Sequence, residues 1–180
     1  MELSARLNRG EGLGDRVLKV NHAGEHGAVN IYAGQRFLAR MTARHMLEEL
    51  EEFQAHEEQH RALFQAELQR RGLRRCRSYS LCAVGGFALG CITGLFGPSA
   101  IAATTVAVER VVLSHLDRQI AALRGKDDAA VDAVARIYGE EREHHDRQLD
   151  HLRAGRLWLT VLSPVVAAST QAVIWLGMHL

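Results

Sequence analysis

Apolar positions recur with the period of an amphipathic helix through most of the chain. This pattern predicts one helix from about Leu13 to Arg40, followed by a break at Met41–Thr42. A polar helix rich in glutamate is expected to follow and to end near Arg71. Ala, Leu, Glu, Arg and Gln, which all favour helices, are abundant, and the chain has only 2 prolines. The sequence therefore predicts an all-α fold.

An uncharged stretch opens the second half of the chain. Residues 78–108 contain no charged side chain, and several glycines interrupt them. Pro98 is expected at the first position of a new helix, because that position has no need of a backbone N–H. This helix should continue to about Leu123, and Gly125 is a typical stop signal just beyond it.

Two further helices are predicted after this stop. Asp127 or Asp128 can cap the first of them, which should extend to about Arg153. The second is an apolar helix over Leu157–Leu180 with Pro164 inside it.

The two apolar segments, 78–108 and 157–180, are long enough to cross a bilayer, since about 20 residues suffice. Glycines and Pro98 interrupt the first segment, and Pro164 lies in the second, so we expect a hairpin lying in the membrane surface. Burial in a protein core and true spanning are the alternatives. The basic run Arg70–Arg77 could meet anionic lipid headgroups or form a solvated loop between helices.

Length and composition narrow the class of protein. The 180 residues are expected to form a single domain, 1–180, in which residues 1–12 are a mobile N-terminal arm. The net charge is +1, which does not favour a nucleic-acid partner. The 3 cysteines show no C-x-x-C spacing, and the N-terminus has no apolar signal segment, so a reducing cytoplasmic location is expected.

Two glutamates stand alone in apolar surroundings. Glu25 is the only acidic residue in 16–47, and Glu109 is the only one in 68–116. Burying an ionised carboxylate costs several kcal/mol unless a cation or a donor compensates it. Arg110 is a poor partner for Glu109, because neighbours in a helix do not face one another. Both carboxylates are therefore predicted to bind a metal.

The spacing of the other candidates supports this prediction. Glu-x-x-His occurs at Glu57–His60 and at Glu141–His144, and residues three apart share one face of a helix. Glu25 precedes the first motif by 32 residues (57 − 25), and Glu109 precedes the second by 32 (141 − 109). The midpoints, 41 and 125, are the two helix breaks predicted above. In antiparallel helices, each glutamate should then lie beside its motif, roughly 24 Å from the turn.

This arrangement is that of a ferritin-like four-helix bundle, here with two additional apolar helices. Such bundles hold two metal ions with one Glu from each of two helices and a Glu-x-x-His motif from each of the others. The predicted ligands are Glu25, Glu57, His60, Glu109, Glu141 and His144. Glu57 and Glu141 lie in charge-dense helices, where each alone could be an ordinary surface residue. His22, Tyr32 and His115 are candidates for contact with the ligands or with a substrate.

Four sequence blocks resemble the demethoxyubiquinone hydroxylase family of ubiquinone biosynthesis. They are HAGEHGAVNIYAGQ, HEEQH, GFALG…TVAVER and EEREHHDRQLDH, and the resemblance extends over residues 13–180. It implies a ferritin-like di-iron monooxygenase that hydroxylates the ring of a polyprenylated methoxy-methyl-benzoquinone. It also implies that the same six residues bind iron, with Glu57 and Glu141 as bridges and Glu25 and Glu109 as terminal ligands. No catalytic residue beyond these ligands is implied.

The resemblance also implies cofactors and partners. These are two iron ions per chain, O₂ as co-substrate and an external reductant such as NADH, although the sequence lacks a G-x-G-x-x-G fingerprint. A lipid-binding accessory protein or a homo-oligomer is expected, with peripheral attachment to the cytoplasmic face of the bacterial inner membrane. Two departures are His26, where relatives often carry Tyr, and Leu116, where mammalian relatives carry Tyr.

Two other functions compete with this prediction. A ferritin-like iron-oxidising or peroxide-scavenging protein would use the same ligands without a quinone and would not need the apolar hairpin. A metal-free helical membrane adaptor would tolerate the loss of Glu109, because the change removes a buried charge.

Overall fold

The computed structural model describes residues 3–152 and 156–180, and in these ranges it contains helices and no strand, which confirms the all-α prediction. The helices are α1 (Leu13–Thr42), the short 3₁₀ turn η1 (Arg44–Met46), α2 (Leu47–Arg70), α3 (Tyr79–Leu95), α4 (Pro98–Leu123), α5 (Asp128–His151) and α6 (Arg156–His179).

The predicted start and stop signals act as expected. Pro98 is the first residue of α4, and Gly125 has a positive φ of 71° just after this helix ends. The side chain of Asp127 caps α5 by accepting a hydrogen bond of 3.1 Å from the backbone N–H of Ala130. The predicted end of this helix at Arg153 lies outside the described residues.

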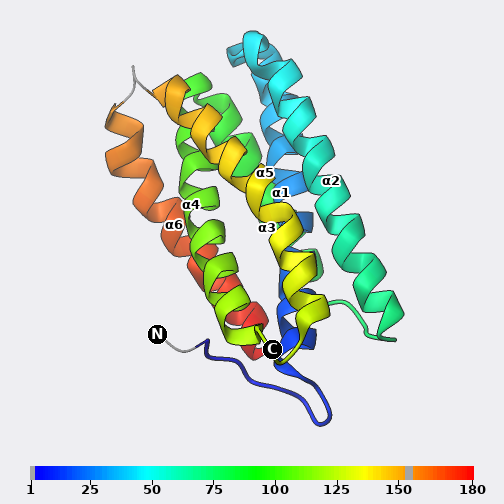
Figure 1. Ribbon diagram of the computed structural model, residues 1–180. Coiled ribbons are helices and arrows are strands. Elements are labelled where there is room, and N and C mark those ends of the chain that lie inside the picture. The colour runs from blue at the N-terminus through cyan, green and yellow to red at the C-terminus, as the bar shows by residue number, and fades with distance from the viewer. Residues whose placement is uncertain (1–2, 153–155) are drawn as a thin grey trace.

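Four of the helices form a bundle, and the two apolar helices lie against it (Figure 1). Helix α1 packs on α2 and α4 packs on α5, while α2 contacts α5 and α1 contacts α4. Helix α3 packs mainly along α1, and α6 packs mainly along α4. The predicted four-helix bundle with two additional apolar helices is therefore confirmed.

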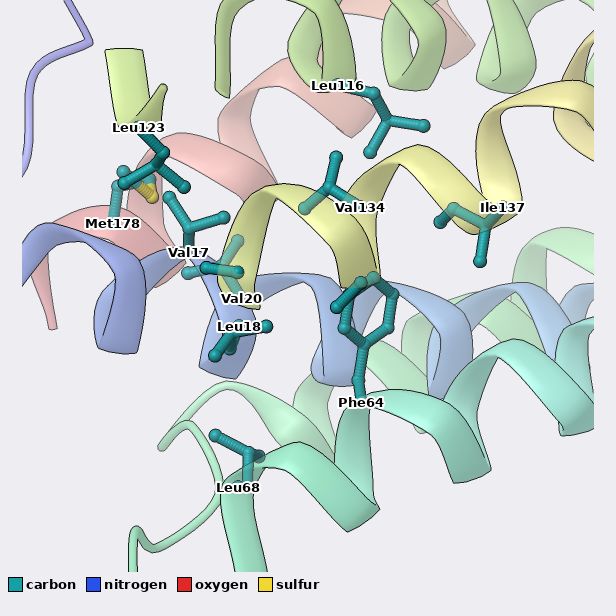
Figure 2. Close-up of a cluster of buried hydrophobic side chains, with 12 residues drawn as sticks. Val17, Leu18, Val20, Phe64, Leu68, Leu116, Leu123, Val134, Ile137 and Met178 are labelled. Atoms are coloured by element: carbon teal, nitrogen blue, oxygen red, sulfur yellow. The ribbon is translucent and has the colours of Figure 1, made fainter. Parts of the chain in front are cut away.

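Two apolar clusters fill the bundle on either side of a polar layer. Figure 2 shows the larger one, which joins α1, α2, α4, α5 and α6 through residues such as Val17, Leu18, Phe64, Val134 and Ile137. The other cluster lies farther along α1 and includes Tyr32, Ala39, Met46, Leu50, Phe53 and Ile101. On α1, α2 and α4, the residues predicted to bind metal lie between these two clusters, and on α5 they follow Ile137 of the larger cluster.

Glycines let α3 approach the backbone of α1. A Cβ atom on Gly86 would lie within 3.0 Å of the carbonyl oxygen of Gly27, and one on Gly90 would lie within 3.0 Å of that of Ile31. Such contacts are too short for any side chain, so only glycine fits at these two positions. The close approach fixes α3 on the outer side of α1.

The predicted N-terminal arm contacts the C-terminal end of α6 through Ser4 and Arg6 and the start of α1 through Glu11. The backbone N–H of Arg6 donates to the carbonyl of Met178 at 2.9 Å. Glu11 forms ion pairs of 2.7 Å with both Arg16 and Lys19. Burial raises the pKa of Glu11, but hydrogen bonds from Lys19, the Asn8 backbone and Arg16 outweigh this effect and hold it at about 2.

Two of the described helical stretches are long and apolar enough to cross a membrane. The first is α4, whose most apolar stretch is 67% buried inside the protein, as expected for a core helix. The second is Thr160–His179 in α6, of which only 22% is buried. Because core helices of soluble proteins share the composition of α4, the exposed helix α6 is the stronger indication of contact with a membrane.

Candidate metal centre

Six buried side chains meet in the polar layer of the bundle. They come from α1 (Glu25), α2 (Glu57 and His60), α4 (Glu109) and α5 (Glu141 and His144), and none is more than 6% exposed. Their ligand atoms form two groups, in each of which the atoms lie within 4.8 Å of one another. The groups share two residues, Glu57 and Glu141. The structure thus brings together all six residues that the spacing singled out.

Each group has the donors to hold a cation. The atoms Glu57 Oε1, His60 Nδ1, Glu141 Oε1 and His144 Nδ1 are buried and form no hydrogen bond. These atoms lie close together without a hydrogen bond between them: His60 Nδ1 is 3.0 Å from Glu141 Oε1, and His144 Nδ1 is 3.2 Å from Glu57 Oε1. Buried polar atoms are nearly always paired in proteins, so these atoms fit ligation of a cation between them. A carboxylate-rich set with one imidazole per ion suits iron or manganese.

The electrostatics of the cluster require a compensating charge. Burial and then the neighbouring Glu141 raise the pKa of both Glu25 and Glu109 well above the usual range of a glutamate. Burial also raises the pKa of Glu57, but the adjoining imidazoles of His144 and His60 outweigh this effect and lower it. Four carboxylates in so small a volume repel one another, and divalent cations would convert that repulsion into attraction.

Two residues outside the predicted set orient the histidine rings. His144 Nε2 lies 3.0 Å from His56 Nδ1, and His60 Nε2 lies 3.0 Å from Glu140 Oε2. With Nε2 protonated and donating to these partners, Nδ1 of each ring is left as the free ligand atom. Each partner directly precedes a ligand glutamate in sequence and serves the histidine of the opposite helix. These two contacts can be predicted only once α2 and α5 are known to face each other.

A cavity of about 430 Å³ reaches the cluster from the side of α1, α3, α4 and α6. Its wall includes the four glutamates, and most of its other lining residues are apolar. Leu81 and Ile92 of α3 line it and are also 54% exposed, so the cavity opens toward the outer face of α3. An apolar molecule could therefore reach the cluster from this face.

The three residues predicted to contact ligands or substrate lie in different places. The Tyr32 hydroxyl is 3.5 Å from Glu109 Oε1, and burial, together with this carboxylate, raises the tyrosine pKa well above its usual value. His115 lines the cavity, where burial and then the charge of Arg118 lower its pKa to about 4. His22 does not line this cavity and lies instead against Tyr79, with ring centroids 4.8 Å apart.

The fold and the site together define a class. A four-helix bundle with one glutamate on each of two helices and Glu-x-x-His on each of the other two has the architecture of the dimetal-carboxylate bundle proteins. Within this class, residues 13–177 match the family described as "Ubiquinone biosynthesis protein COQ7". The chain therefore belongs to the COQ7 family.

Individual relatives agree with this assignment. The chain is 37% identical over 170 residues to a protein of Rhodospirillum rubrum named "3-demethoxyubiquinol 3-hydroxylase", covering 91% of this chain and 76% of the relative. It is 33% identical over 168 residues to a mouse protein named "NADPH-dependent 3-demethoxyubiquinone 3-hydroxylase, mitochondrial", with the same shares covered. The human protein of the same name is 33% identical over 171 residues, which is 92% of this chain and 77% of the relative.

Proposed function

We propose that this protein is an O₂-dependent di-iron monooxygenase that hydroxylates the ring of demethoxyubiquinol, the precursor named in its relatives. The observation that carries the proposal is that the four glutamates of a buried cluster of glutamates and histidines line an apolar cavity. The proposal includes Glu25, Glu57, His60, Glu109, Glu141 and His144 as the iron ligands and the whole chain as one catalytic domain.

The residues around the cluster suit this chemistry. Two iron ions held there would supply the electrons that activate O₂. Apolar residues line most of the cavity and exclude bulk water, which protects a reactive oxidant. With its pKa lowered to about 4, His115 is neutral at pH 7, so its ring can hydrogen-bond a quinol hydroxyl and orient the substrate ring.

The reaction balances with one external reductant. A ring C–H becomes C–OH with one atom of O₂, and the other oxygen atom leaves as water after taking up two electrons and two protons. We predicted an external reductant such as NADH, and the mouse and human relatives are named NADPH-dependent. We propose a reduced nicotinamide dinucleotide of either kind as the source of electrons.

We further propose that the apolar face of α3 and α6 attaches the enzyme peripherally to a membrane. Large apolar side chains on this face are between 44% and 71% exposed. They are Leu81, Val84, Phe87, Ile92 and Leu95 on α3, Phe96 directly after it, and Val161, Val165 and Trp175 on α6. Exposed apolar area of this extent is unusual on a soluble monomer. The cavity opens on the same face, where a polyprenyl substrate dissolved in the bilayer could enter. For a bacterial chain this would be the cytoplasmic face of the inner membrane.

Oxygen consumption tests the proposed reaction. Protein reconstituted with iron should consume O₂ when given a short-chain demethoxyubiquinol and a reductant, and ¹⁸O₂ should label the new ring hydroxyl. Glu57→Gln, which removes a shared ligand, should abolish this turnover. Glu58→Gln makes the same change at the exposed neighbouring position and should leave turnover unchanged.

The same assay separates the proposal from iron oxidation or peroxide scavenging. A ferritin-like oxidase would consume O₂ with ferrous iron alone and at the same rate without the quinol. Turnover of ferrous iron or peroxide with no labelled quinol product would contradict the hydroxylase assignment.

A further inference from the structure

A second pocket, distinct from the apolar cavity, lies where α1 passes the end of α2 and the start of α3. Its volume is about 240 Å³. The polar and aromatic residues that line it are His22 on α1, Gln65 and Gln69 on α2, Arg75 in the following loop and Tyr79 at the start of α3. None of the glutamates of the metal cluster lines it, so this pocket is separate from the metal site.

His22 is the unusual member of this pocket. Its side chain is 4% exposed, yet neither Nδ1 nor Nε2 has a hydrogen-bond partner. Leaving a buried polar group without a partner costs about 1–3 kcal/mol, so such groups are rare in native proteins. An imidazole with two unsatisfied nitrogens on the wall of a pocket indicates that a polar ligand completes the site.

The charges around the pocket indicate the sign of that ligand. Arg75 places its guanidinium 4.7 Å from the centre of the Tyr79 ring, and Arg61 donates to the Tyr79 hydroxyl at 3.2 Å. Among the residues that the structure describes, neither arginine forms an ion pair with a carboxylate. By contrast, Arg71 in the same basic run is paired with Asp127 at 2.6 Å. The residues lining the pocket include no acidic side chain.

We propose that this pocket binds a phosphate group. The guanidinium of Arg75 would provide charge-assisted hydrogen bonds, and His22, Gln65 and Gln69 would provide neutral donors inside the pocket. The phosphate can belong to a phospholipid headgroup, because the exposed apolar face of α3 begins at Leu81, two residues after Tyr79. It can equally belong to a soluble phosphorylated compound. The site does not depend on the metal centre.

Inorganic phosphate is the first probe. Calorimetric titration of the iron-loaded protein, at constant ionic strength with chloride as the balancing anion, should show saturable binding of about one phosphate per chain. Arg75→Gln should weaken it by about 10-fold or more, because a charge-assisted contact is lost. Arg74→Gln removes the same charge from an exposed neighbour that does not line the pocket, and it should change the affinity by less than about 2-fold.

Placing a negative charge in the pocket gives a second, independent test. Gln69→Glu should abolish phosphate binding, whereas Gln59→Glu, an equal change at an exposed position of α2 outside the pocket, should not. All four substitutions are at exposed positions, so each variant should fold as wild type does. Circular dichroism checks this. An equal effect of the pocket and control variants, or no saturable binding by wild type, would overturn the proposal.

Vesicles identify the source of the phosphate. Sedimentation with phosphatidylcholine vesicles, with and without phosphatidylglycerol, measures the gain in binding due to an anionic headgroup. If Arg75→Gln reduces this gain more than Arg74→Gln does, the ligand is a headgroup. If the two variants reduce it equally while Arg75→Gln still loses inorganic phosphate, the ligand is a soluble phosphate compound.

Discussion

Replacing Glu109 by glutamine should have opposite effects on stability with and without metal. This carboxylate is 2% exposed, and burial together with the neighbouring Glu141 raises its pKa strongly. The Tyr32 hydroxyl donates to it over a long distance of 3.5 Å, and its other hydrogen-bond contact is the carboxyl group of Glu141, which carries no compensating positive charge. At pH 7 the metal-free protein must therefore either bury an ionised carboxylate or protonate it, and both reduce stability.

The expected magnitudes follow from this burial. Replacing an uncompensated buried charge by a neutral group of the same shape should stabilise the metal-free protein by about 2 kcal/mol. With metal present at about 1,000 times its dissociation constant, wild type gains about 4 kcal/mol. If Glu109→Gln weakens metal binding about 100-fold by removing an anionic ligand, its gain at the same metal concentration falls to about 1.4 kcal/mol.

Urea unfolding under anaerobic conditions measures both effects, once with a chelator and once with ferrous iron. Glu58→Gln, an exposed neighbour of the cluster, serves as the control and should change neither free energy of unfolding by more than about 0.5 kcal/mol. The opposite result would be that Glu109→Gln destabilises the metal-free protein and leaves the iron-dependent gain as large as in wild type. Glu109 would then be a satisfied core residue with no cation to bind.

Three further predictions concern packing, pH and the membrane. Gly90→Ala should destabilise the protein by about 1–3 kcal/mol in thermal unfolding, because the added methyl group meets a backbone carbonyl of α1. Gly85→Ala, where the methyl group has open space, should instead stabilise the protein by about 0.5–1 kcal/mol. Equal effects of the two substitutions would contradict the close contact. Glu11→Gln should lower the free energy of unfolding by about 2 kcal/mol at pH 7. This difference should disappear as the pH falls from 4.5 to about 2, because the pKa of Glu11 is lowered in the folded state and the carboxylate stabilises the protein only while ionised. A difference that persists at pH 2 would show that the ion pairs are not its cause. Replacing both Leu95 and Phe96 by Asp should release the protein from liposomes in a sedimentation assay without loss of bound iron, because both exposed apolar side chains would be replaced by charges. Unchanged sedimentation would exclude the C-terminal end of α3 as the attachment surface.

The sequence predicted the helices and the six clustered residues for clear physical reasons. Proline at a first helical position, glycine with positive φ after a helix and aspartate as a cap are local signals, so Pro98, Gly125 and Asp127 were readable without tertiary structure. Glu25 and Glu109 were readable because they are isolated charges in apolar helices. Equal spacing from the two turns then placed each of them beside a Glu-x-x-His motif.

What escaped prediction depends on which helices face each other. His56 and Glu140 lie in charge-dense runs, where nothing in the sequence distinguishes them from surface residues. Their roles arise from contacts across α2 and α5. His22 was predicted to contact the metal ligands or a substrate because it flanks Glu25 on α1, but its ring lies in a different pocket, beside Tyr79. Proximity to Glu25 along the helix could not predict the contact between His22 and Tyr79, because the loop after α2 brings Tyr79 to the side of α1 that carries His22.

The central claim is that the cluster holds two coupled iron ions, and Mössbauer spectroscopy tests it most directly. The protein would be reconstituted anaerobically with ⁵⁷Fe and then exposed to oxygen. We expect about two irons per chain and the spectrum of an antiferromagnetically coupled diferric pair, because two ligand groups share Glu57 and Glu141. One iron or none per correctly folded chain, or two uncoupled irons, would contradict it.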